Sequence, residues 1–218
     1  MAVLSELEPN KVFKYFEEIC SIPHGSNNVK QISDYLVDFA KAHNLKCRQD
    51  DDLNVIIWKD GSKGYEDSEP VILQGHMDMV AVQEADCKKD MEKEGLDLEI
   101  NGDFISAKGT SLGGDDGIAV AYTLAVLDDE EMAHPPVEAI FTVNEEIGML
   151  GAASIDVSDL KGRLFMNMDS EDEGVFTVSC AGGASVICKI PYKRDLVNAP
   201  VIEIKLHGFT GGHSGVEI

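Results

Sequence analysis

Residues 71–79 read VILQGHMDM, an apolar run that ends in polar residues. The run predicts a buried β-strand with His76 and Asp78 at its carboxyl end. Side chains two positions apart in a strand point to the same side, so both can address one site. A metal-bound imidazole commonly has its second nitrogen held by a carboxylate, and Asp78 is placed to do this for His76. Taken alone, the triplet is uninformative, because a chain this acidic contains such triplets by chance.

The segments around this run predict an α/β sheet with crossover helices. Further strands are predicted from apolar or alternating runs at residues 45–50, 53–60, 137–146 and 163–174. Helices are predicted from apolar residues at helical spacing, or from a continuous apolar run, at residues 9–21, 29–43 and 118–127. Residues 96–107 predict a hairpin that turns at Asn101-Gly102. Ligands of such sheets gather beyond the carboxyl ends of the strands.

The glycine-rich stretch SLGGDDGI, residues 111–118, precedes one of these helices. Its glycines allow a tight turn before Asp115 and Asp116. Aspartate is also favoured as an N-terminal helix cap, and for this motif alone we favour the cap over a metal ligand. One cap, however, needs only one carboxylate, and here there are two.

Acidic residues also follow two other predicted strands. Glu145 and Glu146 stand side by side after an apolar strand, where like charges repel unless a cation or proton lies between them. One could ligate a metal while the other moves protons, although a solvated loop explains the pair equally well. Asp169 comes directly after the last apolar strand, and we interpret the acids at 171–173 as a solvated run.

Together the four motifs supply one histidine and at least three carboxylates at the ends of strands in one sheet. This mixture of imidazole and oxygen ligands fits zinc, and manganese or cobalt would also be accommodated. With a bridging carboxylate it fits two metals about 3.5–4 Å apart, an arrangement that activates a hydrolytic water. The coincidence of four motifs carries more weight than any one of them.

Composition narrows the class of protein. The 218 residues carry a formal net charge of −22, a field that repels phosphate backbones and anionic lipids, so we expect neither nucleic-acid nor membrane binding. The five cysteines are odd in number and include no CxxC pair, which argues against a disulfide framework and a thiolate zinc site. We find no signal peptide and no run of about 20 apolar residues, so we expect a soluble cytoplasmic protein.

The motifs resemble, in order and along nearly the whole chain, those of the aminoacyl-histidine dipeptidases, also called peptidase D or cytosol non-specific dipeptidase. The segments that carry the resemblance are GHMDMV, SLGGDDGIAVAYTLAVL, NEEIGMLGA, MDSEDEG and GFTGGHSGVEI. The resemblance implies a two-zinc dipeptidase that hydrolyses substrates such as aminoacyl-histidine and forms a homodimer at full length. It implies that His76 and Asp169 bind one metal, Glu146 binds the other, and Asp115 bridges them.

The resemblance also implies roles for three residues that bind no metal. Asp78 would clamp the imidazole of His76, and Glu145 would be the general base. His213, in GGHSG, would be a lid histidine that steadies the substrate oxyanion or carboxylate. Without the resemblance, a turn histidine near a helix start explains His213 equally well.

For the fold, we expect a zinc-exopeptidase-like mixed sheet with flanking helices over residues 1–184, followed by the beginning of a smaller α+β lid or dimerisation domain over 185–218. The family pattern has a further metal-binding histidine after the lid, which this sequence lacks. We therefore expect an N-terminal fragment of a longer enzyme, or a truncated paralogue, that is inactive alone. Two alternatives stay open: an N-acyl amino acid deacylase with the same metal site, and a non-catalytic acidic metal-binding fragment.

Overall fold

The computed structural model describes residues 2–170, 174–179, 186–193, 200 and 202–208. The chain divides into two compact units, Met1–Glu173 and Gly174–Ile218. The helices and strands of the described residues all belong to the first unit. In chain order they are α1 (Asn10–Cys20), α2 (Lys30–Ala42), β1 (Lys46–Gln49), β2 (Val55–Lys59), β3 (Val71–His76), β4 (Leu98–Asn101), β5 (Phe104–Ala107), α3 (Gly114–Asp128), β6 (Val137–Thr142), α4 (Leu150–Ser154) and β7 (Leu164–Asn167).

Five of the strands form one mixed sheet in the order β1-β2-β6-β3-β7. The pairs β1–β2 and β2–β6 are antiparallel, whereas β6, β3 and β7 run parallel to one another. The carboxyl ends of β3, β6 and β7 therefore meet at one edge of the sheet. The sequence motifs that end these three strands are brought to the same side of the molecule, as the predicted α/β sheet requires.

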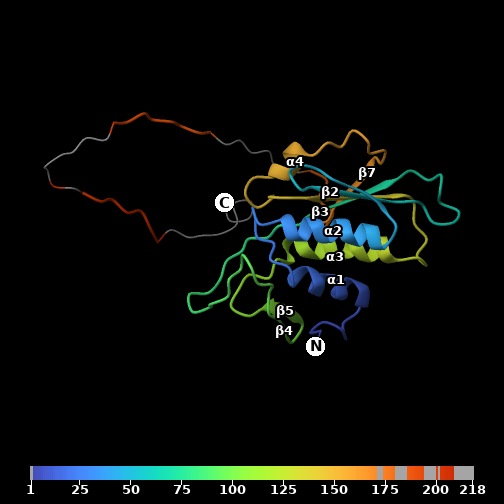
Figure 1. The fold of residues 1–218 in the computed structure, drawn as a ribbon, viewed down its shortest axis with the longest axis horizontal. Coiled ribbons are helices and arrows are strands. Elements are labelled where there is room, and N and C mark those ends of the chain that lie inside the picture. The colour runs from blue at the N-terminus through green and yellow to red at the C-terminus, as the bar shows by residue number, and fades with distance from the viewer. Residues whose placement is uncertain (1, 171–173, 180–185, 194–199, 201, 209–218) are drawn as a thin grey trace. The chain divides into compact units, whose positions relative to one another are not determined.

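Three helices cover one face of this sheet (Figure 1). α2 packs on β1 and β2, α3 packs on β3 and β6, and α1 packs on the outside of α3. α3 is the continuous apolar helix expected at the sheet, and Val120, Ala121 and Leu124 on it are fully buried. The main core lies between this helical layer and the sheet, which supplies Val55, Ile57 and Phe141 among others. Burial of this apolar surface is the main contribution to the stability of the unit.

The other face of the sheet has a small core of its own. Ile56, Ile72 and Ile140 form this second cluster, and Ile155 and Leu160 of the segment before β7 pack against it. Successive side chains of a strand point to opposite faces, so β2 and β6 contribute to both cores. α4 lies on this side (Figure 1).

Two details differ from the sequence prediction. In the hairpin of β4 and β5, Asn101 still pairs with Phe104, so the turn consists of Gly102 and Asp103 and lies one residue later than predicted. Gly102 has a φ of +63°, which glycine adopts without strain. The short helix α4 was not predicted, because its five residues LGAAS are too few for a helical pattern to show.

The second unit contains residues 185–218, which we expect to begin an α+β lid domain. The described residues 186–193 and 202–208 carry no strand assignment. Within the described residues, no helix is both long and apolar enough to span a membrane.

Candidate metal centre

His76 ends β3 and lies at the centre of the site with only 1% of its surface exposed. Its Nδ1 lies 2.9 Å from the backbone carbonyl of Asp78 and 3.5 Å from the Asp78 carboxylate. Its Nε2 faces outward, 2.9 Å from a carboxylate oxygen of Asp115 and 3.9 Å from one of Glu145. The ring is therefore held on one nitrogen and presents the other to carboxylates, as a metal-ligating histidine requires.

The start of α3 brings two aspartates to different atoms of this histidine. Asp115 and Asp116 have non-helical backbone angles, although both fall within the bounds of the helix, and a cis peptide bond joins them. Asp115 reaches the imidazole, whereas Oδ2 of Asp116 accepts a hydrogen bond from the backbone N–H of His76 at 3.1 Å. The N-cap position belongs to Gly113, and no side chain caps the helix. The helix-cap interpretation that we favoured for this motif alone is therefore wrong.

Asp116 is almost fully buried, and a close approach of the chain makes room for it. A Cβ atom at Gly75 would lie only 2.8 Å from Oδ2 of Asp116, so the strand needs a glycine at this point. Burial, together with the charges of Asp169 and Asp115, raises the pKa of Asp116 to about 7, although His76 opposes the shift.

Glu145 and Glu146 lie in the turn after β6, and both are half-buried. Asn144, directly before them, has a φ of +55°, which turns the chain and directs the pair towards His76. The backbone N–H of Glu145 donates to Oδ1 of Asp78 at 3.0 Å. Burial raises the pKa of both glutamates, and the nearby carboxylate of Asp115 adds to the effect. Negative charge is thus concentrated beside the imidazole.

Asp169 follows β7 and is exposed. Its backbone N–H donates to Oδ1 of Asn167 at 3.2 Å, and the amide of Asn167 in turn donates to Gln74 of β3 at 2.7 Å. The charge of Asp169 contributes to the raised pKa of Glu145, which places its carboxylate within electrostatic range of the site. His213 lies outside the described residues.

Three of the predicted metal ligands come together in one group. His76, Asp115 and Glu146 each offer a ligand atom, and these atoms all lie within 4.8 Å of one another. Zinc binds imidazole nitrogen and carboxylate oxygen at about 2.0–2.2 Å, so a small adjustment of the side chains would bring these atoms to one ion, or to two ions with Asp115 between them. Crowded carboxylates beside a clamped imidazole favour a divalent cation, which would offset their mutual repulsion. The residues present fit a metal of the zinc type.

The imidazole itself also responds to these charges. Burial alone would lower the pKa of His76, but hydrogen bonding to Asp78 and the charges of Asp116 and Asp78 outweigh it and raise the pKa to about 10. A histidine that ligates a metal must be neutral, so a metal entering the site has to displace this proton from His76.

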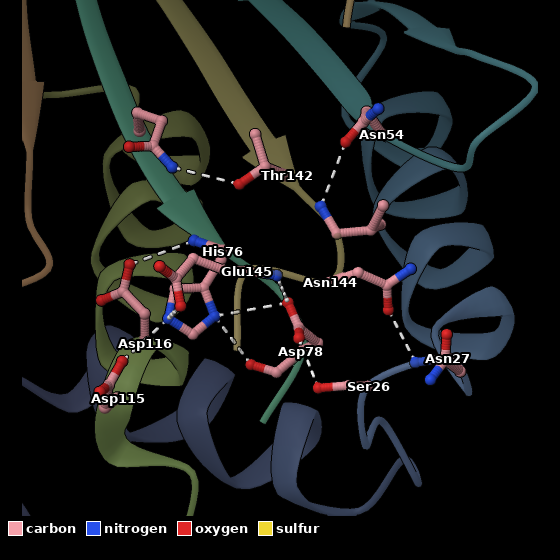
Figure 2. Close-up of polar contacts among 12 residues, drawn as sticks. Ser26, Asn27, Asn54, His76, Asp78, Asp115, Asp116, Thr142, Asn144 and Glu145 are labelled. Atoms are coloured by element: carbon pink, nitrogen blue, oxygen red, sulfur yellow. Dashed lines mark hydrogen bonds and ion pairs between the residues drawn. The ribbon is translucent and has the colours of Figure 1, made fainter. Parts of the chain in front are cut away.

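Sequence reasoning missed the residues that support the site. Figure 2 shows hydrogen bonds from Ser26 to Asp78, from Asn27 to Asn144 and from Val143 to Asn54. These residues lie far from their partners in the sequence. For Ser26 and Asn27, the local signal was the polar composition of the loop between the first two predicted helices, and such loops are common.

No family model matches this sequence. The chain is 39% identical over 220 residues to the cytosol non-specific dipeptidase of Escherichia coli (strain K12), covering 100% of this chain and 45% of that protein. It is 39% identical to the aminoacylhistidine dipeptidase of Vibrio alginolyticus, whose crystal structure superposes with a TM-score of 0.76 over 78% of this chain and 35% of that one. A tripeptidase structure from Staphylococcus aureus shares the fold at 21% identity, with a TM-score of 0.63 over 76% of this chain and 44% of that one.

The mixed sheet with helices on its faces and a histidine–carboxylate site beyond its strand ends defines the class of zinc-exopeptidase-like α/β proteins. Within that class, the comparisons support the aminoacyl-histidine dipeptidase family for this chain. It spans less than half the length of either family relative, 45% of one and 35% of the other.

Proposed function

We propose that this chain carries the metal-binding part of a cytoplasmic dipeptidase that hydrolyses dipeptides such as aminoacyl-histidine. The observation that carries the proposal is the convergence of His76, Asp115 and Glu146, whose ligand atoms lie within 4.8 Å of one another. Similarity to the dipeptidase family supports the choice of a peptide bond as the target. The same family relation argues against the N-acyl amino acid deacylase.

The proposed site holds two divalent ions, zinc being favoured by the ligand types. His76 and Asp169 would hold one ion, Glu146 the other, and Asp115 would bridge them. When bound, such ions would lower the pKa of a water molecule and polarise the scissile carbonyl. The proximity of Asp115 to the imidazole of His76, 2.9 Å, supports its place between the two ligand sets.

Glu145 is proposed as the general base that takes a proton from the attacking water and later delivers it to the departing amine. Its carboxylate lies 3.9 Å from Nε2 of His76, and its pKa is raised by burial and neighbouring acids, which suits a group that must accept and release a proton. Asp78 orients both His76 and Glu145 through its buried carboxylate. His213 is proposed to steady the substrate, as a lid residue.

We place the boundary between the catalytic domain and the lid at residues 184 and 185, and expect further catalytic groups, including one histidine ligand, outside this chain. The complete enzyme is proposed to be a homodimer. Each of these statements concerns the whole protein, of which the chain corresponds to less than half in its relatives.

The test measures zinc stoichiometry by metal analysis after dialysis, and hydrolysis of alanyl-histidine against acetylated amino acids. We expect wild type and Glu145→Gln to bind equal zinc, and His76→Ala to bind less. Where the wild type turns over dipeptide, Glu145→Gln should lower kcat by about 10²–10⁴-fold. The exposed Glu131 provides the control variant Glu131→Gln, which should match wild type in both assays.

The outcomes separate the parts of the proposal. Equal zinc in His76→Ala and wild type would overturn the metal site, and near-normal turnover in Glu145→Gln would overturn the general base. Faster hydrolysis of acetylated amino acids would favour the deacylase. Zinc binding without turnover would place the remaining catalytic groups outside these 218 residues.

A further inference from the structure

The loop between α1 and α2 runs alongside the segment that follows β3. The backbone N–H of Met79 donates to the carbonyl of His24, and the N–H of Ser26 donates back to the carbonyl of Met79, each at 3.1 Å. Gly25 and Met79 form a parallel bridge between these segments. A Cβ atom at Gly25 would lie 2.7 Å from Cβ of Ala81, so the two segments are as close as a glycine allows.

This close approach brings the hydroxyl of Ser26 within hydrogen-bonding distance of the buried carboxylate of Asp78. The hydroxyl donates to Oδ2 of Asp78 at 2.7 Å, whereas Oδ1 accepts from the backbone N–H of Glu145 at 3.0 Å (Figure 2). Oδ1 also lies 3.5 Å from Nδ1 of His76, and the Asp78 side chain has no exposed surface. One buried carboxylate thus joins the loop, the end of β3 and the turn after β6.

The same loop contacts the glutamate turn a second time. The backbone N–H of Asn27 donates to Oδ1 of Asn144 at 2.7 Å (Figure 2). Asn27 and Asn144 both have positive φ angles, +67° and +55°, so each lies in a tight turn. On its other side the loop lines a groove of about 740 Å³ together with residues such as Gln83 and Met91. On its inner side the loop is held by the backbone of Met79 and by its polar contacts with Asp78 and Asn144.

We propose that Ser26 is a positioning residue of the site: its hydroxyl fixes the rotation of the Asp78 carboxylate, and through it the imidazole of His76 and the backbone of Glu145. A carboxylate that loses one of its donors in a buried site rotates or draws in water, because a buried charged oxygen without a partner is costly. An effect of Ser26 on catalysis rests on the proposed function, but its effect on Asp78 and Glu145 can be tested without measuring turnover.

The primary test uses NMR to measure hydrogen exchange of the Glu145 backbone amide in the metal-free 218-residue chain. Ser26→Ala should speed exchange of this amide by about tenfold or more, since hydrogen bonds to buried charged groups are strong. Ser26→Thr keeps the hydroxyl and should stay within about threefold of wild type on the same reasoning. Amides of Ile72 and Leu73 inside β3 report on global opening and should not change.

Ser62→Ala is the matched control. The hydroxyl of Ser62 is half-buried, and it donates to the carbonyl of His134 and accepts the backbone N–H of the same residue. This pair precedes β6, at the end of the strand opposite Glu145, so its loss should leave the Glu145 amide unchanged. If Ser26→Ala leaves exchange at Glu145 as in wild type, or speeds exchange at Ile72 and Leu73 equally, the proposal is overturned.

A second measurement separates this inference from the proposed function. Zinc affinity, determined by competition with a chromophoric chelator, should fall about tenfold in Ser26→Ala and recover in Ser26→Thr, as for other groups that orient metal ligands. Failure of the wild-type chain to bind zinc would contradict the proposed function while the exchange result still decides the role of Ser26. Tight zinc binding that is the same in wild type and Ser26→Ala would overturn the positioning role alone.

Discussion

Replacing Glu138 by glutamine should weaken the attachment of the segment that leads into β7 and so loosen the position of Asp169. Glu138 is 3% exposed within the otherwise apolar strand β6. It points to the same face as Ile140, towards the small second core. Its carboxylate accepts the backbone N–H of Lys161 at 3.0 Å and that of Gly162 at 2.8 Å, immediately before β7 begins.

The expected magnitude follows from these bonds. A hydrogen bond to a charged group contributes about 1.5–3 kcal/mol, and a buried donor left without a partner costs about as much. Glutamine keeps one acceptor oxygen but turns an NH₂ group towards the second backbone N–H, so Glu138→Gln should lower the free energy of unfolding by about 2–4 kcal/mol. With an m-value of about 2 kcal/mol/M, the urea midpoint should fall by about 1–2 M.

The assay is urea denaturation of the metal-free chain, with tryptophan fluorescence as the probe of unfolding. Fluorescence is suitable because the single tryptophan, Trp58, pairs with Glu138 across the sheet. Circular dichroism provides a second probe of the same transition. Glu131→Gln, an exposed glutamate in the loop before β6, is the control and should leave the midpoint unchanged. A Glu138→Gln midpoint within 0.2 M of wild type, taken as about the error of such measurements, would refute the reasoning.

Two further predictions concern other parts of the fold. Burial opposes ionisation of Asp128, but hydrogen bonding from Tyr15 and the charge of Lys11 outweigh burial and lower the pKa of Asp128. The ionised carboxylate therefore stabilises the folded chain above the unfolded pKa of about 3.9. This stabilisation is lost as the pH falls through the pKa of Asp128 in the folded chain. Asp128→Asn should therefore cost about 1 kcal/mol at pH 6–7 and less as pH falls below about 3.9, as measured by urea denaturation at each pH, and a constant difference would contradict this. Gly75→Ala places a Cβ atom 2.8 Å from Oδ2 of Asp116, so it should lower stability by about 1–3 kcal/mol and weaken zinc binding; a variant equal to wild type in both would refute the close packing.

The main elements of the fold could be predicted from the sequence because their signals are local. Both VEAIFT and IAVAYTLAVL are apolar runs, and their lengths and flanking residues distinguish a strand from a helix. Each forms the predicted element, within β6 and α3 respectively. The ends of the elements were predicted less accurately than their centres: α3 begins at Gly114, before the apolar run from which the helix was predicted. Buried Glu138 shows a further limit, because a strand pattern does not reveal which backbone donors a carboxylate in it will meet.

The predicted ligands His76, Asp115 and Glu146 lie together, and each stands near a boundary that the sequence marks: His76 and Glu146 follow apolar strand patterns, and Asp115 precedes an apolar helix. Their supporting contacts could not be predicted in this way. Ser26 is 52 residues from Asp78, and Asn54 is 89 residues from Val143, so no local pattern connects them. Such contacts depend on how the loops approach one another in three dimensions, which a single sequence does not record.

The site concentrates repelling charges, and the fold must supply the free energy that holds them together. Burial and neighbouring acids raise the pKa of Glu145, Glu146 and Asp116, so ionising these groups in the metal-free chain opposes folding. The segments that carry them are each fixed from elsewhere: the glutamate turn through Asn54 and Asp78, and Asp116 through the backbone of β3. Because the core between sheet and helices keeps these segments in place, the carboxylates cannot relax apart. A divalent cation then gains the full attraction of ligands whose ordering was already established during folding.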